Sequence, residues 1–197
     1  MNMKRILKDK LSEIALAGSL IFSSLNMCAT ENNKDKYDYT SAIKKQLIEH
    51  EGYRNSVYRD TKNKPTIGIG FNLTRQDAHS RLEKVGAQYD LVIAGKQKLT
   101  DEQIRILFER DVKDAVASAK RCIRNYDAQP EEVKSIVIDM VFNLGEEGFR
   151  KFVNTRKHIE GRNYTLAAEE MKRSLWYKQV GNRGARLVEK MSGITSK

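Results

Sequence analysis

Residues 48–71 read IEHEGYRNSVYRDTKNKPTIGIGF, and the change of pattern inside this segment is the strongest structural signal in the 197-residue chain. Its first residues complete a helical pattern that starts near Thr40 or Ser41, because apolar side chains recur along nearly one face of a helix. The residues on this face are Ile43, Leu47, Ile48 and Glu51. Gly52 is expected to end the helix, which places Glu51 in its last turn.

The rest of the segment predicts a β-hairpin. The run Val57-Tyr58-Arg59 is followed by a polar turn at residues 60–64 and then by PTIGIGF at residues 65–71. β-Branched and aromatic residues on both sides of a turn are typical of paired strands. The glycines of the second run let another part of the chain approach its backbone closely. We therefore predict two strands directly after the first helix.

The sequence after residue 99 predicts helices. Thr100 and Gln103 form a capping box, and an apolar stripe follows it at Ile104, Leu107, Phe108 and Val112. Residues 131–144 carry a wider stripe, as expected of a central buried helix. Its members are Val133, Ile136, Val137, Met140, Val141 and Leu144. Shorter helices are expected at 149–160, at 165–175 and from Asn182, a good N-cap residue. The predicted fold class is α+β, with a small lobe carrying the hairpin or short sheet, a mainly helical lobe, and a cleft between them.

Residues 1–30 have the organisation of an export signal. A basic head precedes the uncharged run IALAGSLIFSSLNMCA at residues 14–29, and a polar tail follows. This run is shorter than the roughly 20 residues that a membrane span needs. We therefore expect a periplasmic or extracellular protein, with transient membrane association through this segment. The segment can end in cleavage after Ala29, in lipidation at Cys28 or in retention as a membrane anchor.

The remaining chain is basic. Residues 31–39 read as a polar tether, and residues 31–197 keep a net charge of +8, from 32 lysines and arginines against 24 acidic residues. Such a charge suits a polyanion, namely nucleic acid, acidic lipid or the bacterial cell wall. No basic stripe interleaved with aromatic residues is present, so we expect no nucleic-acid partner. The histidines are scattered and the cysteines lack a zinc spacing, so we expect neither a metal nor another cofactor.

Glu51, Asp60 and Thr66 have the chemistry of a glycosidase site. A glycosidase uses one carboxyl group that donates a proton to the leaving oxygen and another that stays ionised. Glu51 lies at the end of an apolar helical face, where desolvation favours a protonated carboxyl group. Asp60 opens a polar turn, and Thr66 across the hairpin can hold a water with its hydroxyl. The spacing alone does not identify such a site, because most acidic residues are solvated surface groups.

Three separated parts of the chain resemble the phage-type lysozymes, glycoside hydrolase family 24. The first part resembles the family's active-site region and comprises IEHEGYR at 48–54, VYRDT at 57–61 and TIGIG at 66–70. The second part is similar to the family's buried helix with its glycine stop, and reads MVFNLGE at 140–146. The third part, near the C-terminus, comprises SLWY at 174–177 and NRGAR at 182–186. The order of the parts is that of the family, and the resemblance spans residues 41–191.

The resemblance implies a lysozyme-like fold for residues 40–197. It also implies hydrolysis of the β-1,4 bond between N-acetylmuramic acid and N-acetylglucosamine in bacterial peptidoglycan. Glu51 matches the general acid, Asp60 the water-orienting carboxylate and Thr66 the hydroxyl that completes the site, in the arrangement of an inverting enzyme.

The resemblance further suggests substrate-binding residues at Asn143, Trp176 and Arg183. Asn143 and Trp176 match positions near the cleft wall, although Trp176 reads equally well as a core aromatic residue. Arg183 matches a residue that pairs with the catalytic glutamate, and its alternative is a solvated arginine at a helix start. Tyr58 and Phe71 line the cleft or belong to the core.

The chain departs from the family in three places. His50 precedes the acid where an acidic or polar residue is often found, and the turn at residues 62–65 is more basic than usual. Phe71 stands where members commonly carry a histidine that serves as a structural ion-pair partner, so that contact is in doubt.

Two other functions remain open: a non-catalytic wall-binding protein, and a lytic transglycosylase that cuts the same bond with one carboxylate. The filled positions at Glu51, Asp60 and Thr66 argue against both. We expect a monomer that acts on peptidoglycan, and the sequence does not show whether an inhibitor or immunity protein binds it.

Overall fold

The computed structural model describes residues 41, 43–60 and 63–195. The predicted export signal and tether, with Thr40 at the expected start of the first helix, lie outside these residues. Among the described helices, none is both long enough and apolar enough to cross a membrane.

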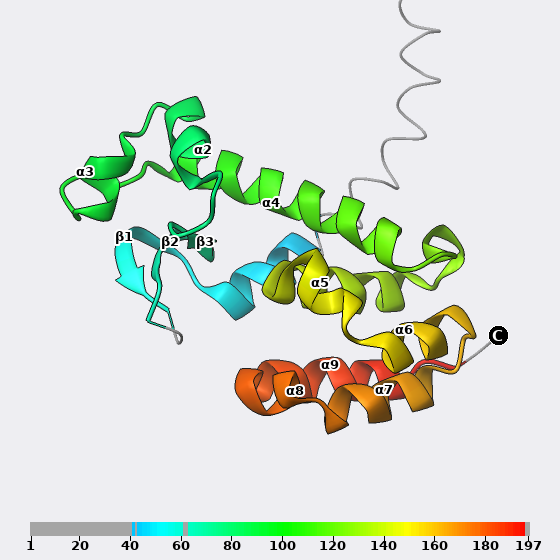
Figure 1. The fold of residues 1–197 in the computed structure, drawn as a ribbon. Coiled ribbons are helices and arrows are strands. Elements are labelled where there is room, and N and C mark those ends of the chain that lie inside the picture. The colour runs from blue at the N-terminus through cyan, green and yellow to red at the C-terminus, as the bar shows by residue number, and fades with distance from the viewer. Residues whose placement is uncertain (1–40, 42, 61–62, 196–197) are drawn as a thin grey trace, which may run out of the picture. The chain divides into compact units, whose positions relative to one another are not determined.

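The described elements follow the predicted change from a short sheet to helices (Figure 1). A first helical segment covers residues 43–51. It is followed by β1 (Arg54–Arg59), β2 (Pro65–Gly68), β3 (Phe71–Asn72), α2 (Ala78–Lys84), α3 (Tyr89–Ile93), α4 (Asp101–Cys122), the 3-10 turn η1 (Tyr126–Ala128), α5 (Glu131–Arg150), α6 (Val153–Glu160), α7 (Tyr164–Arg173), α8 (Leu175–Val180) and α9 (Asn182–Ser192). The predicted α+β class is confirmed. The short helices α2, α3 and α8 were not predicted.

The strands form one antiparallel sheet in the order β1-β2-β3. The predicted hairpin is confirmed, with Tyr58 opposite Thr66. The prediction of a single second strand over residues 65–71 is wrong. Gly68 and Gly70 have φ values of +66° and +70°, a backbone conformation that glycine adopts readily. They turn the chain after β2, so that Phe71 of β3 pairs with Ile67 of β2.

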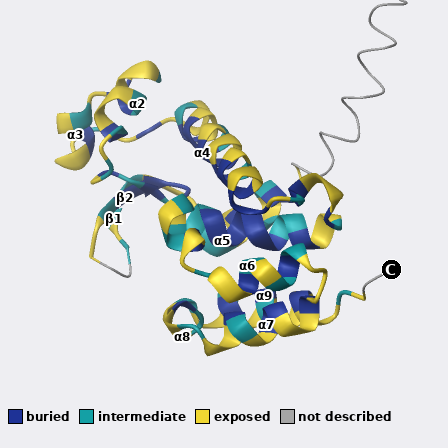
Figure 2. Cartoon of the chain, turned by 45° about the vertical axis from the view of Figure 1, so that its right-hand side comes forward, coloured by how far each residue is buried: buried dark blue, intermediate teal, exposed yellow. Residues whose placement is uncertain are grey.

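Helices α4 and α5 pack along each other and carry much of the buried surface (Figure 2). The capping box at Thr100 and Gln103 is confirmed, and so is the buried stripe of α4. The stripe of α5 is buried except for Leu144, which is half-buried next to a kink at Gly145, where φ is +71°. Helix α9 packs against both α5 and α7. This packing brings the C-terminal part of the chain to the middle of α5.

Three local predictions are wrong. Ile48 is 39% exposed, because the buried face of the first helix is centred on Ile43 and Leu47. Asn182 is the first residue of α9, and Gly181 occupies the N-cap position without a side-chain cap. Residue 149 belongs to α5, so that α6 starts only at Val153.

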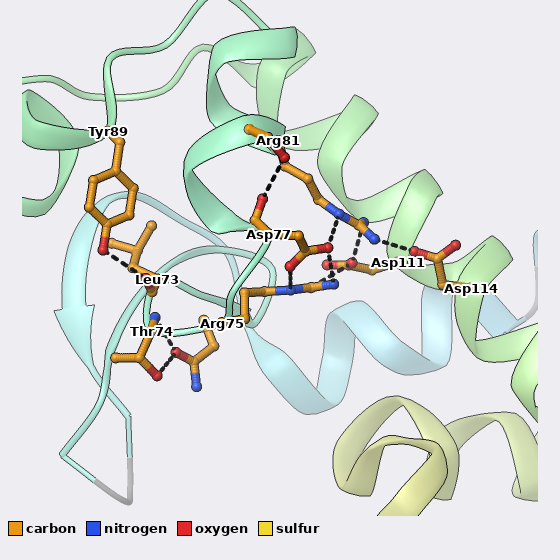
Figure 3. Close-up of polar contacts among 10 residues, drawn as sticks. Leu73, Thr74, Arg75, Asp77, Arg81, Tyr89, Asp111 and Asp114 are labelled. Carbon is orange, nitrogen blue, oxygen red and sulfur yellow. Dashed lines mark hydrogen bonds and ion pairs between the residues drawn. The ribbon is translucent and has the colours of Figure 1, made fainter.

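A cluster of ion pairs fastens the segment after β3 to α4 (Figure 3). We call Arg75, Arg81, Asp77, Asp111 and Asp114 the loop–α4 cluster. Asp111 accepts hydrogen bonds from both guanidinium groups, at 2.8 and 2.9 Å. Both arginines also bind Asp77, and Arg81 binds Asp114.

One member of the loop–α4 cluster, Arg75, contacts one of the positions where the sequence departs from the family. Phe71 is buried, and the Arg75 guanidinium lies over its ring at 5.2 Å from the ring centre. The side chain of residue 71 therefore contributes a cation–π contact, and the ion pairs to α4 come from Arg75 and Arg81.

Candidate active site

Glu51 is the last residue of the first helix. Gly52 ends the helix with φ +73°, and its N–H donates to the carbonyl of Ile48. The Glu51 side chain is 19% exposed, and its Oε1 accepts a hydrogen bond of 2.5 Å from Nη1 of Arg183. Its Oε2 faces the backbone of Gly70, where an added Cβ would lie only 2.9 Å from that oxygen. The helix end and the β2–β3 turn thus hold the carboxyl group from two sides.

Arg183 bridges Glu51 and a second carboxylate, that of Asp139 on α5. Its Nε donates to Asp139 Oδ1 at 2.7 Å, and its side chain is 10% exposed. Burial lowers the pKa of this guanidinium, but the charges of Asp139 and Glu51 outweigh burial and raise it above its usual value. Arg183 is therefore a buried, permanently charged link, and not a solvated arginine at the start of α9.

Asp139 is fully buried and fully hydrogen-bonded. Its side chain has 0% exposure, and Oδ2 accepts from Gln46 at 2.7 Å and lies 2.9 Å from Nδ1 of His50. Burial by itself raises the pKa of this carboxyl group. Hydrogen bonds from His50, Arg183 and Gln46, together with the Arg183 charge, outweigh burial and hold the pKa below its usual value. Asp139 is therefore a buried anion.

Asp60 and Thr66 meet around the backbone of Lys64. The Asp60 N–H donates to the Lys64 carbonyl, and Asp60 Oδ1 accepts from the Lys64 N–H at 2.8 Å. Thr66 is 3% exposed, and its hydroxyl donates to the same Lys64 carbonyl at 3.2 Å. The Thr66 oxygen consequently keeps its lone pairs for a donor such as water.

The pKa of Tyr58 is affected by both carboxyl groups. Burial is the largest cause that raises the pKa of its phenol, and the charges of Glu51 and Asp60 also raise it. Arg54 and a hydrogen bond from the Gly70 N–H oppose this shift. The half-buried phenol of Tyr58 is therefore affected by the charges of both acidic groups. A hollow of about 470 Å³ lined by residues 53–58 opens beside Tyr58.

Asn143 and Trp176 form a pair of their own. The Trp176 indole N–H donates to Asn143 Oδ1 at 3.0 Å, and the ring is 4% exposed with an edge contact to Phe152. This is the environment of a core aromatic residue with a satisfied N–H. Contact of either side chain with substrate stays a prediction.

Sequence reasoning missed Asp139, Gln46 and the position of His50. A signal for Asp139 was present, because this acidic residue interrupts the apolar run IVIDMV at 136–141, and a buried charge requires partners. In the described part of the chain, no group of three or more His, Cys, Asp or Glu side chains is placed to hold a metal ion.

A short antiparallel sheet that follows a helix ending in a glutamate, together with a set of packed helices, is consistent with the architecture of a lysozyme-like glycoside hydrolase. The family model described as phage lysozyme matches residues 48–193. The chain is 31% identical to probable T4-type lysozyme 1 of Dictyostelium discoideum, over 75% of this chain and 92% of that protein. The chain therefore belongs to the phage lysozyme family and is an enzyme of the glycoside hydrolase class.

Two phage proteins match the same chain with part of their length. The pre-baseplate central spike protein Gp5 of Enterobacteria phage T4 is 29% identical over 74% of this chain and 27% of its own length. The peptidoglycan hydrolase gp36 of Enterobacteria phage SP6 is 25% identical over 68% of this chain and 14% of its own length. The lysozyme-like unit is thus similar to one portion of larger proteins.

Proposed function

We propose that the chain hydrolyses the β-1,4 bond between N-acetylmuramic acid and N-acetylglucosamine in peptidoglycan, with Glu51 as general acid. Peptidoglycan hydrolysis is the reaction that membership of the phage lysozyme family supports. One observation carries the assignment of the acid. Glu51 is bound by Arg183 through one oxygen, while its partly exposed carboxyl group faces the turn between β2 and β3.

In the proposed reaction, Glu51 donates its proton to the O4 oxygen of N-acetylglucosamine as the bond from C1 of N-acetylmuramic acid breaks. A water donates a hydrogen bond to the Thr66 oxygen and is oriented by the Asp60 carboxylate. This water attacks C1 from the opposite face. The water's oxygen forms the new bond, and its proton passes to Asp60 and then to solvent, while Glu51 regains a proton from solvent. This single displacement inverts the configuration at C1.

The products test the proposal directly. Purified full-length chain is incubated with peptidoglycan, and the released sugar ends are identified by mass, with the Glu51→Gln protein as the matched control. We expect reducing N-acetylmuramic acid ends from the wild type only. Products with anhydro ends would show a lytic transglycosylase, and reducing N-acetylglucosamine ends would show cleavage of the other glycosidic bond. Either product would overturn the proposal.

Because peptidoglycan lies outside the cytoplasm, we also propose that residues 1–30 direct export. The uncharged run behind a basic head supports this role. Fusion of these residues to a reporter active only outside the cytoplasm should give signal. A silent reporter, with the full-length protein found in the cytoplasm, would contradict export.

A further inference from the structure

The carboxylate of Asp139 stands behind the proposed acid, on the far side of Arg183. The three groups form a chain in which Glu51 Oε1 binds Nη1 of the guanidinium and Asp139 Oδ1 binds its Nε. A weaker contact of 3.4 Å joins Nη2 to the Asp139 backbone carbonyl. Asp139 therefore fixes the plane of the guanidinium, and with it the direction from which Nη1 meets Glu51.

The hydrogen bonds to Asp139 fix the orientation of its carboxylate, because both oxygens are bound. Oδ2 is occupied by Gln46 and His50, both on the helix that ends at Glu51. Lys190 of α9 in turn donates to the side-chain amide oxygen of Gln46, Oε1, at 2.8 Å. The helix that ends at Glu51 thus carries both the proposed general acid and two side chains that bind Asp139. Burial without these partners would be costly for an anion.

The charges explain what such a buried anion contributes. A guanidinium beside a carboxyl group favours the ionised carboxylate, whereas the proposed reaction needs Glu51 protonated. Asp139 is a second anion on the same guanidinium, and it stays ionised because it is bound by three donors. The positive charge of Arg183 is therefore already compensated before Glu51 is considered.

We propose that Asp139 is a positioning residue of the active site, which, held by His50 and Gln46, orients Arg183 and supplies its counter-charge so that Glu51 can carry the catalytic proton. This role rests on the proposed function. Other titratable groups near this chain are Tyr58 of the hairpin, whose phenol is affected by the charge of Glu51, and His50, which precedes Glu51 and binds Asp139. The side-chain carboxylates that bind the guanidinium of Arg183 are those of Glu51 and Asp139.

The variant Asp139→Asn tests the charge with little change of shape. Asparagine Oδ1 can still accept from Arg183 Nε, and Gln46 and His50 can reorient their donors and acceptors to face its amide. Without the counter-charge, the positive charge of Arg183 is no longer compensated by a second anion, and it attracts the carboxylate form of the general acid more strongly. We expect the alkaline limb of the kcat/KM profile on peptidoglycan to move down by about one pH unit or more.

Asp111→Asn is the matched control. Asp111 is also a buried aspartate held by arginine side chains, but it belongs to the loop–α4 cluster. Both amide variants should lose thermal stability, and only Asp139→Asn should move the pH profile. A second variant, His50→Gln, keeps both carboxylates and Arg183. It should reduce kcat less than Asp139→Asn and leave the alkaline limb in place.

A measurement on the wild type does not depend on the folding of any variant. The side-chain carboxyl carbon of Asp139 can be followed by NMR from neutral to acid pH. It should show that the group stays ionised to a pH below the ordinary aspartate pKa of about 3.9. Protonation at or above that range would overturn the inference. So would an unshifted alkaline limb in a folded, active Asp139→Asn protein. A wild type that does not hydrolyse peptidoglycan would instead overturn the proposed function.

Discussion

Two clusters of arginine and carboxylate groups lie in this protein, and they are built differently. In the loop–α4 cluster, the buried Asp111 is bound by two guanidinium groups, and its neighbours Asp77 and Asp114 reach solvent. In the cluster of Glu51, Arg183, Asp139 and His50, which we call the site cluster, the buried aspartate shares a single guanidinium with Glu51. Its remaining oxygen is bound by an amide and an imidazole.

The difference separates a structural tie from a reactive site. Two arginines around Asp111 hold the segment after β3 against α4 (Figure 3). Each carboxylate of this cluster is bound by at least one of these two arginines. In the site cluster, Arg183 binds two carboxylates. Glu51 therefore shares its charged partner with Asp139, and its carboxyl group is partly exposed. We infer that equal changes in the two clusters have unequal effects on activity and on stability.

The largest difference is expected for matched amide substitutions of Glu51 and Asp77. Glu51→Gln keeps an oxygen that accepts from Arg183 but has no proton to donate, so peptidoglycan hydrolysis should fall by about 10²–10⁴-fold while the protein stays folded. Asp77→Asn should leave kcat/KM of the folded protein unchanged. Initial rates of sugar release and circular dichroism of both variants check this. An active Glu51→Gln enzyme would remove Glu51 from the role of acid.

A smaller loss is expected at Thr66, which lies in β2 opposite Tyr58. Thr66→Val keeps the branched shape and removes the hydroxyl that we assign to the water, and misplacing that water should cost about 10²-fold in kcat. Thr66→Ser, which keeps the hydroxyl, should retain most activity. Steady-state kinetics of the two variants side by side decide the point. Equal activity of the valine and serine variants would show that no water is held there.

The acid stability of the protein should report Asp139. Because its folded-state pKa lies below the unfolded value of about 3.9, its contribution to stability is fully present above that value. The contribution is lost as pH falls through the folded-state pKa. Breaking a buried pair costs about 3–5 kcal/mol, so Asp139→Asn should lower Tm clearly at neutral pH. The difference in Tm from wild type should shrink below about pH 4, and a constant difference would contradict the lowered pKa.

The smallest effect concerns salt and the exposed side of the loop–α4 cluster. Exposed ion pairs contribute about 0–1 kcal/mol and are screened by salt. The difference in unfolding free energy between wild type and Asp77→Asn should therefore shrink on adding salt, whereas that for Asp139→Asn should not. Urea unfolding at low and high salt measures both. Equal salt sensitivity would mean that the two clusters are solvated alike.

Local patterns predicted the parts of the fold that local interactions determine. The capping box at Thr100 and the stripe of α4 depend on residues three or four positions apart, and both are confirmed. The break between β2 and β3 was missed, because glycine in a strand pattern fits a bend or a close approach equally well. At Gly70 the structure has both: a positive φ and the carboxyl group of Glu51.

The site cluster depends on contacts between distant parts of the chain. Glu51 and Arg183 are 132 positions apart, and His50 and Asp139 are 89 apart. Periodicity carries no information on such pairs, and the Arg183 contact was suggested only by the family resemblance. Asp139 was overlooked because its apolar neighbours on α5 satisfied the pattern of a core helix. The packing of α9 and of the first helix against α5 is what brings these side chains together.

The stereochemistry of the first product tests the proposed single displacement most directly. Proton NMR of the sugar released from peptidoglycan in the first moments of reaction distinguishes the two anomers before they equilibrate. If Asp60 and Thr66 hold a water opposite Glu51, the β-linked substrate yields an α-configured N-acetylmuramic acid end. A β-configured end would mean that the configuration is retained through two displacements, and would contradict the roles given to Asp60 and Thr66.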